Sequence, residues 1–337
     1  MPIRHFLSEK HIIDCLHAHY GIDVVTLQRL SLGADINALV YKAEKQDKSA
    51  YFVKLKRGHH HDIGIAIVEL LHQKGVQAVI PPIKTRQGHP TLNTDNFTLI
   101  MYPFIEGQDG FNRPLKNPQW LTLGMTLRQV HKIDVPSTIK QQLRQETYSS
   151  TYRDMVRSFY PYLDVLPLND NIAQEVSAFM KQHIRIIQRL VDRAEQLANI
   201  IQNESPPLVL CHSDIHGGNV LMANDKTLYI VDWDEPMMAP KERDLMFIGG
   251  GVANVWNNAH EEEIFYKGYG ETEINQTILA YYRHERIVDD IAEYGPHLLL
   301  TSSGGEERIE MYKHFIAMFE PRGVIDIAFK TDENLHR

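Results

Sequence analysis

The spacing of apolar residues changes once along the chain, near Pro103, and this change restricts the possible folds more than any other feature of the sequence. Between Val24 and Leu55, three short apolar segments are separated by polar turns, and Phe97–Tyr102 forms a further segment. Short apolar segments bounded by turns are typical of strands, and consecutive strands of this kind pair antiparallel. After Pro103, apolar residues recur mainly at the spacing of one helix face.

We therefore expect an α+β fold with two lobes, because sheet and helices are segregated along the chain. Residues 1–102 are predicted to form a small lobe with an antiparallel sheet, 103–107 a hinge, and 108–337 a larger, mainly helical lobe. The helical segments predicted from the spacing are 8–20, 62–74, 120–131, 152–160, 172–201, 261–269, 278–293 and 306–319.

Composition excludes several classes of protein. The 337 residues carry a formal net charge of −8, which disfavours general binding to a nucleic-acid backbone and favours a cationic ligand. The two cysteines, Cys15 and Cys211, cannot form a disulfide framework or a four-cysteine zinc site. No apolar run approaches the roughly 20 residues that cross a bilayer, and residues 1–10 contain no signal-peptide core. We expect a cytoplasmic protein that binds neither membranes nor nucleic acids.

A polar loop between two short apolar runs, 208–211 and 228–231, contains the residues that indicate chemistry. Asp214 and Asn219 lie five positions apart in this loop, and Asp232 follows the second run. Phosphoryl transfer from ATP needs a carboxylate that orients the attacking hydroxyl and oxygen ligands that hold Mg²⁺. We interpret Asp214 as the base and Asn219 and Asp232 as the metal ligands, because protein-kinase loops have the same spacing from Asp to Asn.

A phosphotransferase also needs a cation for the nucleotide phosphates. Lys54 on the third predicted strand is suited to this role, with Asp62 or Glu69 of the following helix as its carboxylate partner. The backbone N–H groups of the turn at 33–37 are expected to donate to phosphate oxygens.

These residues resemble the aminoglycoside phosphotransferase and choline kinase superfamily, whose usual loop is close to His-Gly-Asp-Leu-His-Pro-Gly-Asn. Here 212–219 reads His-Ser-Asp-Ile-His-Gly-Gly-Asn, with Ser213 in place of glycine and Gly217 in place of proline. The stretches 211–219, 230–251 and 281–291 are most similar to the spectinomycin-phosphorylating class of that family. The resemblance implies a protein-kinase-like fold and transfer of the ATP γ-phosphate to a hydroxyl of spectinomycin, a cationic aminocyclitol antibiotic that is thereby inactivated.

The resemblance also implies roles for individual residues. It makes Asp244 a structural support of the loop, and we also interpret His212 as structural. Gly64 or a neighbour stands where the family often has its helix glutamate, and we prefer Asp62 as the partner of Lys54. The nucleotide-binding residues that the resemblance implies near the phosphates and adenine are Asp35, Asn37, Met101, Tyr102 and Phe104.

The substrate wall is predicted from chemistry, since cationic amines and a sugar-like ring favour carboxylates and an aromatic side chain. The candidates are Asp234, Glu235, Trp256, His284, Glu285 and Asp289.

Other functions remain open at this stage. The same fold could phosphorylate choline, homoserine, methylthioribose or a related alcohol, or it could be a nucleotide-binding pseudokinase. His212 and His216 beside Asp214 could be ligands in a metallo-hydrolase, although we favour a structural role for both. Cys211 could be a nucleophile, but its apolar run favours an inert buried thiol.

Overall fold

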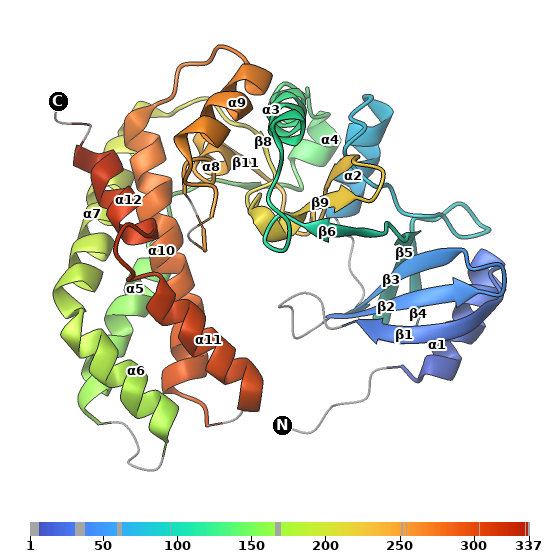
Figure 1. The fold of residues 1–337 in the computed structure, drawn as a ribbon, viewed down its shortest axis with the longest axis horizontal. Helices are drawn as coiled ribbons and strands as arrows, with labels where there is room; N and C mark the ends of the chain where they lie inside the picture. The colour runs from blue at the N-terminus through green and yellow to red at the C-terminus, as the bar shows by residue number, and fades with distance from the viewer. Residues whose placement is uncertain are drawn as a thin grey trace. The chain divides into compact units, whose positions relative to one another are not determined.

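The computed structural model describes residues 7–30, 38–58, 63–94, 96–165, 170–250, 252–253, 255–302, 304–333 and 335 (Figure 1). The chain divides into two compact units. The first unit contains residues 1–113, 136–142 and 219–236, and the second contains 114–135, 143–218 and 237–337. The position of the hinge at 103–107 stays a prediction.

The first unit is built on a five-stranded antiparallel sheet with the order β1-β2-β3-β5-β4. The strands are β1 (Val24–Leu30), β2 (Ala38–Lys45), β3 (Ala50–Arg57), β4 (Thr91–Thr94) and β5 (Phe97–Pro103). The first three form a meander because each polar turn joins neighbours, as the sequence predicts.

The two faces of this sheet differ in polarity because side chains alternate along each strand. On one face, Val53 and Leu55 of β3 pack against Ile12 of α1 (Glu9–Cys15) and Leu16 of a π-helical turn (Leu16–Tyr20). Full burial of one such side chain contributes about 1.5–3 kcal/mol. Lys54 and the other residues of alternate register therefore lie on the opposite face of β3.

A second, three-stranded sheet of the first unit has the order β10-β9-β6. Its strands are β6 (Gly107–Asp109), β9 (Val220–Ala223) and β10 (Leu228–Ile230). β9 and β10 form an antiparallel hairpin. Two helices, α2 (Ile63–Gln73) and α4 (Ser137–Lys140), contact each other in the same unit.

The second unit is mainly helical and packs around α10, the long orange helix in Figure 1. Buried residues of α5, α6, α7, α10, α11 and α12 share one hydrophobic core. The helices are α3 (Asn117–His131), α5 (Thr151–Phe159), α6 (Asn171–Gln182), α7 (Ile184–Glu204), α8 (Glu242–Leu245), α9 (Ala259–Tyr269), α10 (Gln276–Leu299), α11 (Gly305–Ala317) and α12 (Val324–Glu333), with 3-10 turns at Tyr160–Asp164 and Gly217–Asn219.

A small sheet supports the polar loop in this unit. Its strands are β7 (Arg144–Gln145), β8 (Val209–Cys211) and β11 (Met237–Ala239), in the order β7-β11-β8. The loop between 211 and 219 thus leaves one sheet at β8 and enters a different sheet at β9.

Helices α3 and α9 approach each other closely because each has a glycine at the contact. A Cβ atom on Gly124 would clash with the carbonyl oxygen of Phe265, and one on Gly268 would clash with that of Leu121. Any larger residue at either position must push the two helices apart.

The predicted fold class, an antiparallel-sheet lobe with a larger helical region, is confirmed. The single helix predicted over 172–201 is wrong, because the chain leaves helical geometry at His183, where ψ is 10°. The imidazole of His183 stacks on Phe179 and contacts Phe319. No helix in the described part of the chain combines the length and the apolar character needed to cross a membrane.

Candidate active site

In the first unit, Lys54 joins two carboxylates that follow strand β10. Its Nζ lies 2.9 Å from Asp232 Oδ1 and 2.7 Å from Asp234 Oδ2. The Nζ of Lys56, two residues further along the same face of β3, lies 2.9 Å from Asp234 Oδ1. Two lysines and two aspartates thus form one continuous polar network on the face opposite α1.

The charges in this network stabilise one another. Burial acts to lower the pKa of Lys54, but the carboxylates of Asp232 and Asp234 outweigh it and raise that pKa above the ordinary value. Burial acts to raise the pKa of Asp234, and the ammonium groups of Lys54 and Lys56 outweigh it and lower that pKa. Lys54 and Asp234 are therefore charged at neutral pH.

The β9–β10 hairpin brings Asn219 to the same end as Asp232. Asn219 directly precedes β9, and its carbonyl oxygen accepts a hydrogen bond of 2.9 Å from the backbone N–H of Val231. Asp232 has a φ of 62°, a left-handed conformation that is uncommon for a non-glycine residue and is found at functional sites. An amide oxygen and two carboxylates at one hairpin end are the oxygen donors that Mg²⁺ prefers, so these residues fit the predicted metal.

In the second unit, Asp214 lies between a histidine and an arginine. Its Oδ1 lies 2.7 Å from Arg286 Nη1, and its Oδ2 lies 3.4 Å from His216 Nε2. Arg286 extends from α10 and also pairs through Nε with Asp290 Oδ1 at 3.0 Å. Burial acts to raise the pKa of Asp214, but His216 and Arg286 lower it below the ordinary value. The carboxylate is therefore ionised and ready to accept a hydrogen bond.

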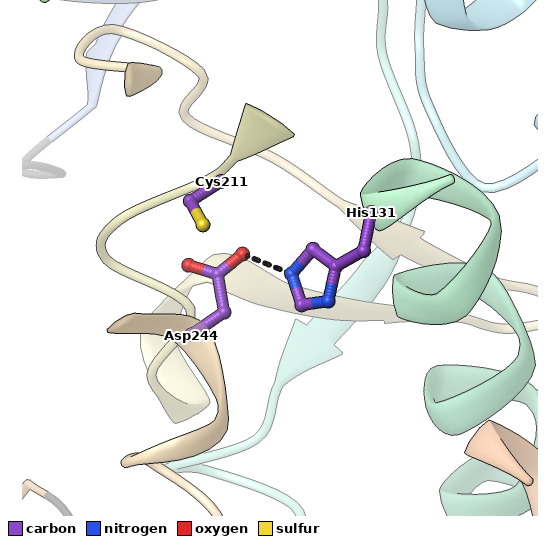
Figure 2. A group of neighbouring side chains, drawn as sticks. All are labelled: His131, Cys211 and Asp244. Atoms are coloured by element: carbon purple, nitrogen blue, oxygen red, sulfur yellow. Dashed lines mark hydrogen bonds and ion pairs between the residues drawn. The ribbon is translucent and has the colours of Figure 1, made fainter. Parts of the chain in front are cut away.

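Asp244, on α8, holds the backbone at the start of this loop. Its Oδ2 accepts from His212 N at 2.9 Å and its Oδ1 accepts from Ser213 N at 2.7 Å. Figure 2 shows that its Oδ2 also meets His131 Nε2, at 3.0 Å. Ser213 has a φ of 74°, a region that favours glycine, so the fixed turn explains why glycine is common here in the resembling family.

Cys211 lies beside Asp244 and His131 in Figure 2, within reach of a shared metal ion. Its Sγ instead lies 3.6 Å from the carbonyl oxygens of Ala239 and Pro240. Burial raises the pKa of the Cys211 thiol well above its usual value. A protonated thiol is neither a nucleophile nor a good metal ligand, so we assign this cluster a structural role.

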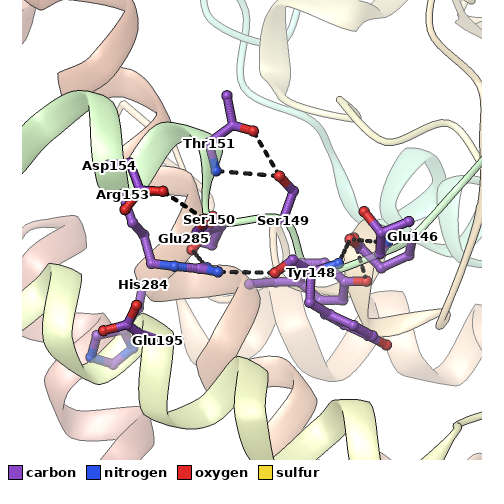
Figure 3. A network of polar contacts seen from close by, with 12 residues as sticks. Glu146, Tyr148, Ser149, Ser150, Thr151, Arg153, Asp154, Glu195, His284 and Glu285 are labelled. Atoms are coloured by element: carbon purple, nitrogen blue, oxygen red, sulfur yellow. Dashed lines mark hydrogen bonds and ion pairs between the residues drawn. The ribbon is translucent and has the colours of Figure 1, made fainter.

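Two residues of the predicted substrate wall lie in the interior of the second unit. Figure 3 shows Glu285 paired with Arg153, whose Nη1 lies 2.6 Å from Glu285 Oε2. His284 is fully buried, and its Nδ1 bonds to Ala280 O at 2.8 Å. Their assignment to the substrate wall stays a prediction.

The other wall candidates differ in their surroundings. Trp256 is buried edge-on against Trp120, whereas Glu235 is exposed. The carboxylate of Asp234 forms ion pairs with Lys54 and Lys56 of β3. Asp289 on α10 has a buried Oδ1 atom with no hydrogen-bond partner, and burial raises its pKa to about 7 despite the opposing charge of Arg286.

Several predicted nucleotide-binding residues have no assigned contact. Asp35, Asn37 and Asp62 lie outside the described residues, and Glu69, the alternative partner of Lys54, pairs with Lys84 Nζ at 2.8 Å. Met101 and Phe104 take part in backbone hydrogen bonds outside the strands: Ile83 N donates to Met101 O at 2.7 Å, and Phe104 N donates to Ala50 O at 3.2 Å. Tyr102 lies opposite Phe52 in β3.

The sequence interpretation missed Lys56, Arg286 and Asp290. The alternation that placed Lys54 on the polar face of β3 also places Lys56 there, so this signal was present. The spacing i, i+4 predicts the pair of Arg286 and Asp290 on one helix. Nothing in the local sequence indicates that this pair meets Asp214.

Comparison with known proteins supplies the identification. Residues 27–280 match the family described as the phosphotransferase enzyme family. The chain belongs to this family. This confirms the resemblance found from the loop and strand motifs. A comparison with curated proteins gave no match.

Solved structures of this phosphotransferase family give the same result. The chain is similar to spectinomycin phosphotransferase solved with ADP and spectinomycin, with 47% identity and a TM-score of 0.92 over 97% of this chain and 99% of that chain. An AMP complex of spectinomycin phosphotransferase matches with 46% identity and a TM-score of 0.87 over 95% and 98%. A choline kinase from Streptococcus pneumoniae, 14% identical with a TM-score of 0.54 over 91% and 97%, shares the fold.

Proposed function

We propose that this phosphotransferase transfers the γ-phosphate of ATP to a hydroxyl of spectinomycin and thereby inactivates the antibiotic. The observation that carries the proposal is the similarity, at 47% identity over 97% of the chain, to a phosphotransferase whose structure holds ADP and spectinomycin. The two buried free thiols agree with a reducing compartment, and we place the reaction in the cytoplasm.

Asp214 is the base in this proposal. An ionised carboxylate accepts a hydrogen bond from the attacking hydroxyl, fixes its direction toward phosphorus, and takes its proton as the new bond forms. Asp244 supports this step through the backbone of residues 212 and 213.

Asn219 and Asp232 would hold Mg²⁺, and Asp234 offers a third oxygen ligand at the same hairpin end. When bound, Mg²⁺ neutralises charge on the phosphate oxygens. Lys54 and Lys56 supply two further positive charges from one strand face, and Lys54 is the group that we expect on the α and β phosphates. Asn219 follows Asp214 by five positions in the same loop, the spacing found in protein-kinase loops. This spacing supports one reaction for the base and the metal ligands.

The remaining nucleotide contacts are proposed from the family pattern. We propose that residues 103–107 form the hinge and that backbone groups of Met101, Tyr102 and Phe104 bind adenine. The turn that includes Asp35 and Asn37 would cover the phosphates.

Asp289 supports a cationic acceptor. Its carboxylate oxygen is buried without a partner, which costs free energy unless a donor completes it. An ammonium group of the aminocyclitol provides such a donor. Exposed Glu235 offers a second carboxylate, and the net charge of −8 favours the same class of ligand.

The test measures ADP release from ATP and Mg²⁺ with purified protein and spectinomycin, kanamycin, choline, homoserine or no acceptor, and identifies the phosphorylated product by mass spectrometry. We expect turnover with spectinomycin. Removal of a general base typically slows turnover about 10²- to 10⁴-fold, so Asp214→Asn should lose activity to that extent while it still binds ATP.

The matched control is Asp192→Asn, which removes a carboxylate from an exposed ion pair with Arg157. This variant should retain wild-type turnover. Turnover with choline or homoserine but not spectinomycin would reject the acceptor, and full activity of Asp214→Asn would reject the base.

A further inference from the structure

We propose that Arg286 is a positioning residue for Asp214: its guanidinium bridges Asp214 and Asp290 and holds the reacting carboxylate in one orientation. This inference rests on the proposed function, because it assigns a role around the base of that reaction.

The geometry of Arg286 matches a bridge between two carboxylates. Nη1 lies 2.7 Å from Asp214 Oδ1, and Nε, on the other edge of the planar group, lies 3.0 Å from Asp290 Oδ1. The side chain is only 17% exposed, and its guanidinium carbon lies 5.9 Å from the ring centre of Phe247. Nη1 donates a hydrogen bond to Asp214, whereas Nε is ion-paired with Asp290 without hydrogen-bond geometry. A planar group held between two carboxylates has little freedom to rotate.

Asp290 gives Arg286 a second carboxylate partner on its own helix. It lies one helical turn after Arg286 on α10, so it holds the guanidinium from the helix itself. Because Asp290 holds the guanidinium, Arg286 does not move with Asp214 and can fix the orientation of that carboxylate. A single ion pair between two flexible side chains would not impose this constraint.

Arg286 also helps to keep Asp214 ionised. The groups that face this carboxylate are His212 and His216 on its own loop and Arg286 and Asp290 on α10. Burial and the charge of Asp290 both favour protonation of Asp214, whereas the hydrogen bond with His216 and the charge of Arg286 oppose it. Burial acts to lower the pKa of Arg286, but Asp290 and Asp214 raise it, so the guanidinium stays charged. Without Arg286, the half-buried carboxylate of Asp214 would face the carboxylate of Asp290.

The test compares Arg286→Met and Arg286→Lys with wild type in the spectinomycin assay. Loss of a group that orients a reacting residue typically costs about 10- to 100-fold in rate. We expect kcat of Arg286→Met to fall by that factor with KM for ATP unchanged, and the acid limb of its pH profile to move to higher pH. A lysine can reach one carboxylate but not both, so Arg286→Lys should recover part of kcat.

Arg283→Met provides the matched control. Arg283 lies three residues earlier on α10 and donates to Ile248 O and Thr331 Oγ1, both at 2.7 Å, without contact to Asp214. Its loss also removes a buried guanidinium from the same helix, but it should leave the pH profile in place. Thermal unfolding of all variants separates loss of fold from loss of activity.

Two results would overturn the positioning role. The first is a kcat and pH profile of folded Arg286→Met that match wild type. The second is a rise in KM for ATP with kcat unchanged, which would show that Arg286 binds the nucleotide directly.

Failure of the proposed function is distinguishable from failure of this inference. If wild type phosphorylates no acceptor, the proposed function fails. The pKa of Asp214 is then measured by carboxyl ¹³C NMR, and the signal that is lost in Asp214→Asn identifies the Asp214 resonance. A higher pKa in Arg286→Met than in wild type supports the bridge, and an unchanged pKa refutes it.

Discussion

Replacement of Asp244 by asparagine tests how the loop before Asp214 is held. The carboxylate satisfies the buried N–H groups of His212 and Ser213, one with each oxygen. Asparagine keeps a single oxygen, so its NH₂ group must face one of those donors. A buried N–H without an acceptor costs about 1–3 kcal/mol. Because 1.4 kcal/mol is a factor of ten, we expect the loop amides to exchange about 5- to 150-fold faster.

The assay is hydrogen–deuterium exchange of a peptide that spans 208–218, followed by mass spectrometry. Asp332→Asn is the control, since Asp332 accepts from Arg193 in another part of the second unit. Burial acts to raise the pKa of Asp244, but the hydrogen bond with His131 and its other contacts lower it. Its contribution is therefore present at neutral pH and is lost as pH falls through the lowered folded-state pKa. Unchanged exchange in Asp244→Asn at pH 7 would refute the reasoning.

Substitutions at three further positions probe other features. Ser213→Val should lower the free energy of unfolding by about 1–3 kcal/mol because of the left-handed backbone, and Ser213→Gly should not; urea unfolding compares them. Glu285 has a pKa raised to about 7 by burial against the effect of Arg153, so its stabilisation is full at low pH and is lost as pH rises through 7. Glu285→Gln should flatten the dependence of Tm on pH between about 4.5 and 7, and a slope equal to that of wild type would contradict this. Gly124→Ala should cost about 1–3 kcal/mol by overpacking against Phe265 O, which thermal unfolding measures.

The sequence predicts the elements whose pattern is local. Alternation gave the three strands between Val24 and Leu55, and helical spacing gave most helices of the second unit. Strands β9 and β11 were not predicted. Each pairs with a strand from a distant part of the chain, β9 with β6 and β11 with β7, and local patterns do not indicate such pairing. The break at His183 was missed because α6 and α7 bury apolar residues on both sides of it, so the spacing reads as one helix.

The prediction of the candidate site was likewise limited to patterns within short segments of the sequence. Lys54, Asp214, Asn219 and Asp232 were proposed from motif spacing, which is a property of short segments. The partners of these residues come from elsewhere in the chain. Arg286 is 72 residues from Asp214, and no local rule indicates that they meet. His284 and Glu285 were placed in the substrate wall by residue type alone, and residue type does not indicate that both side chains are buried in the second unit.

Burial of both native thiols has a practical consequence for labelling. Cys15 lies in the core between α1 and the first sheet, and Cys211 lies behind the polar loop. Maleimide reagents modify exposed thiolates, so the wild-type chain should react slowly without any cysteine being removed. A single cysteine introduced on the surface would then carry a fluorophore or a spin label at a known position, and one such site in each unit would report the distance between the units as nucleotide is added.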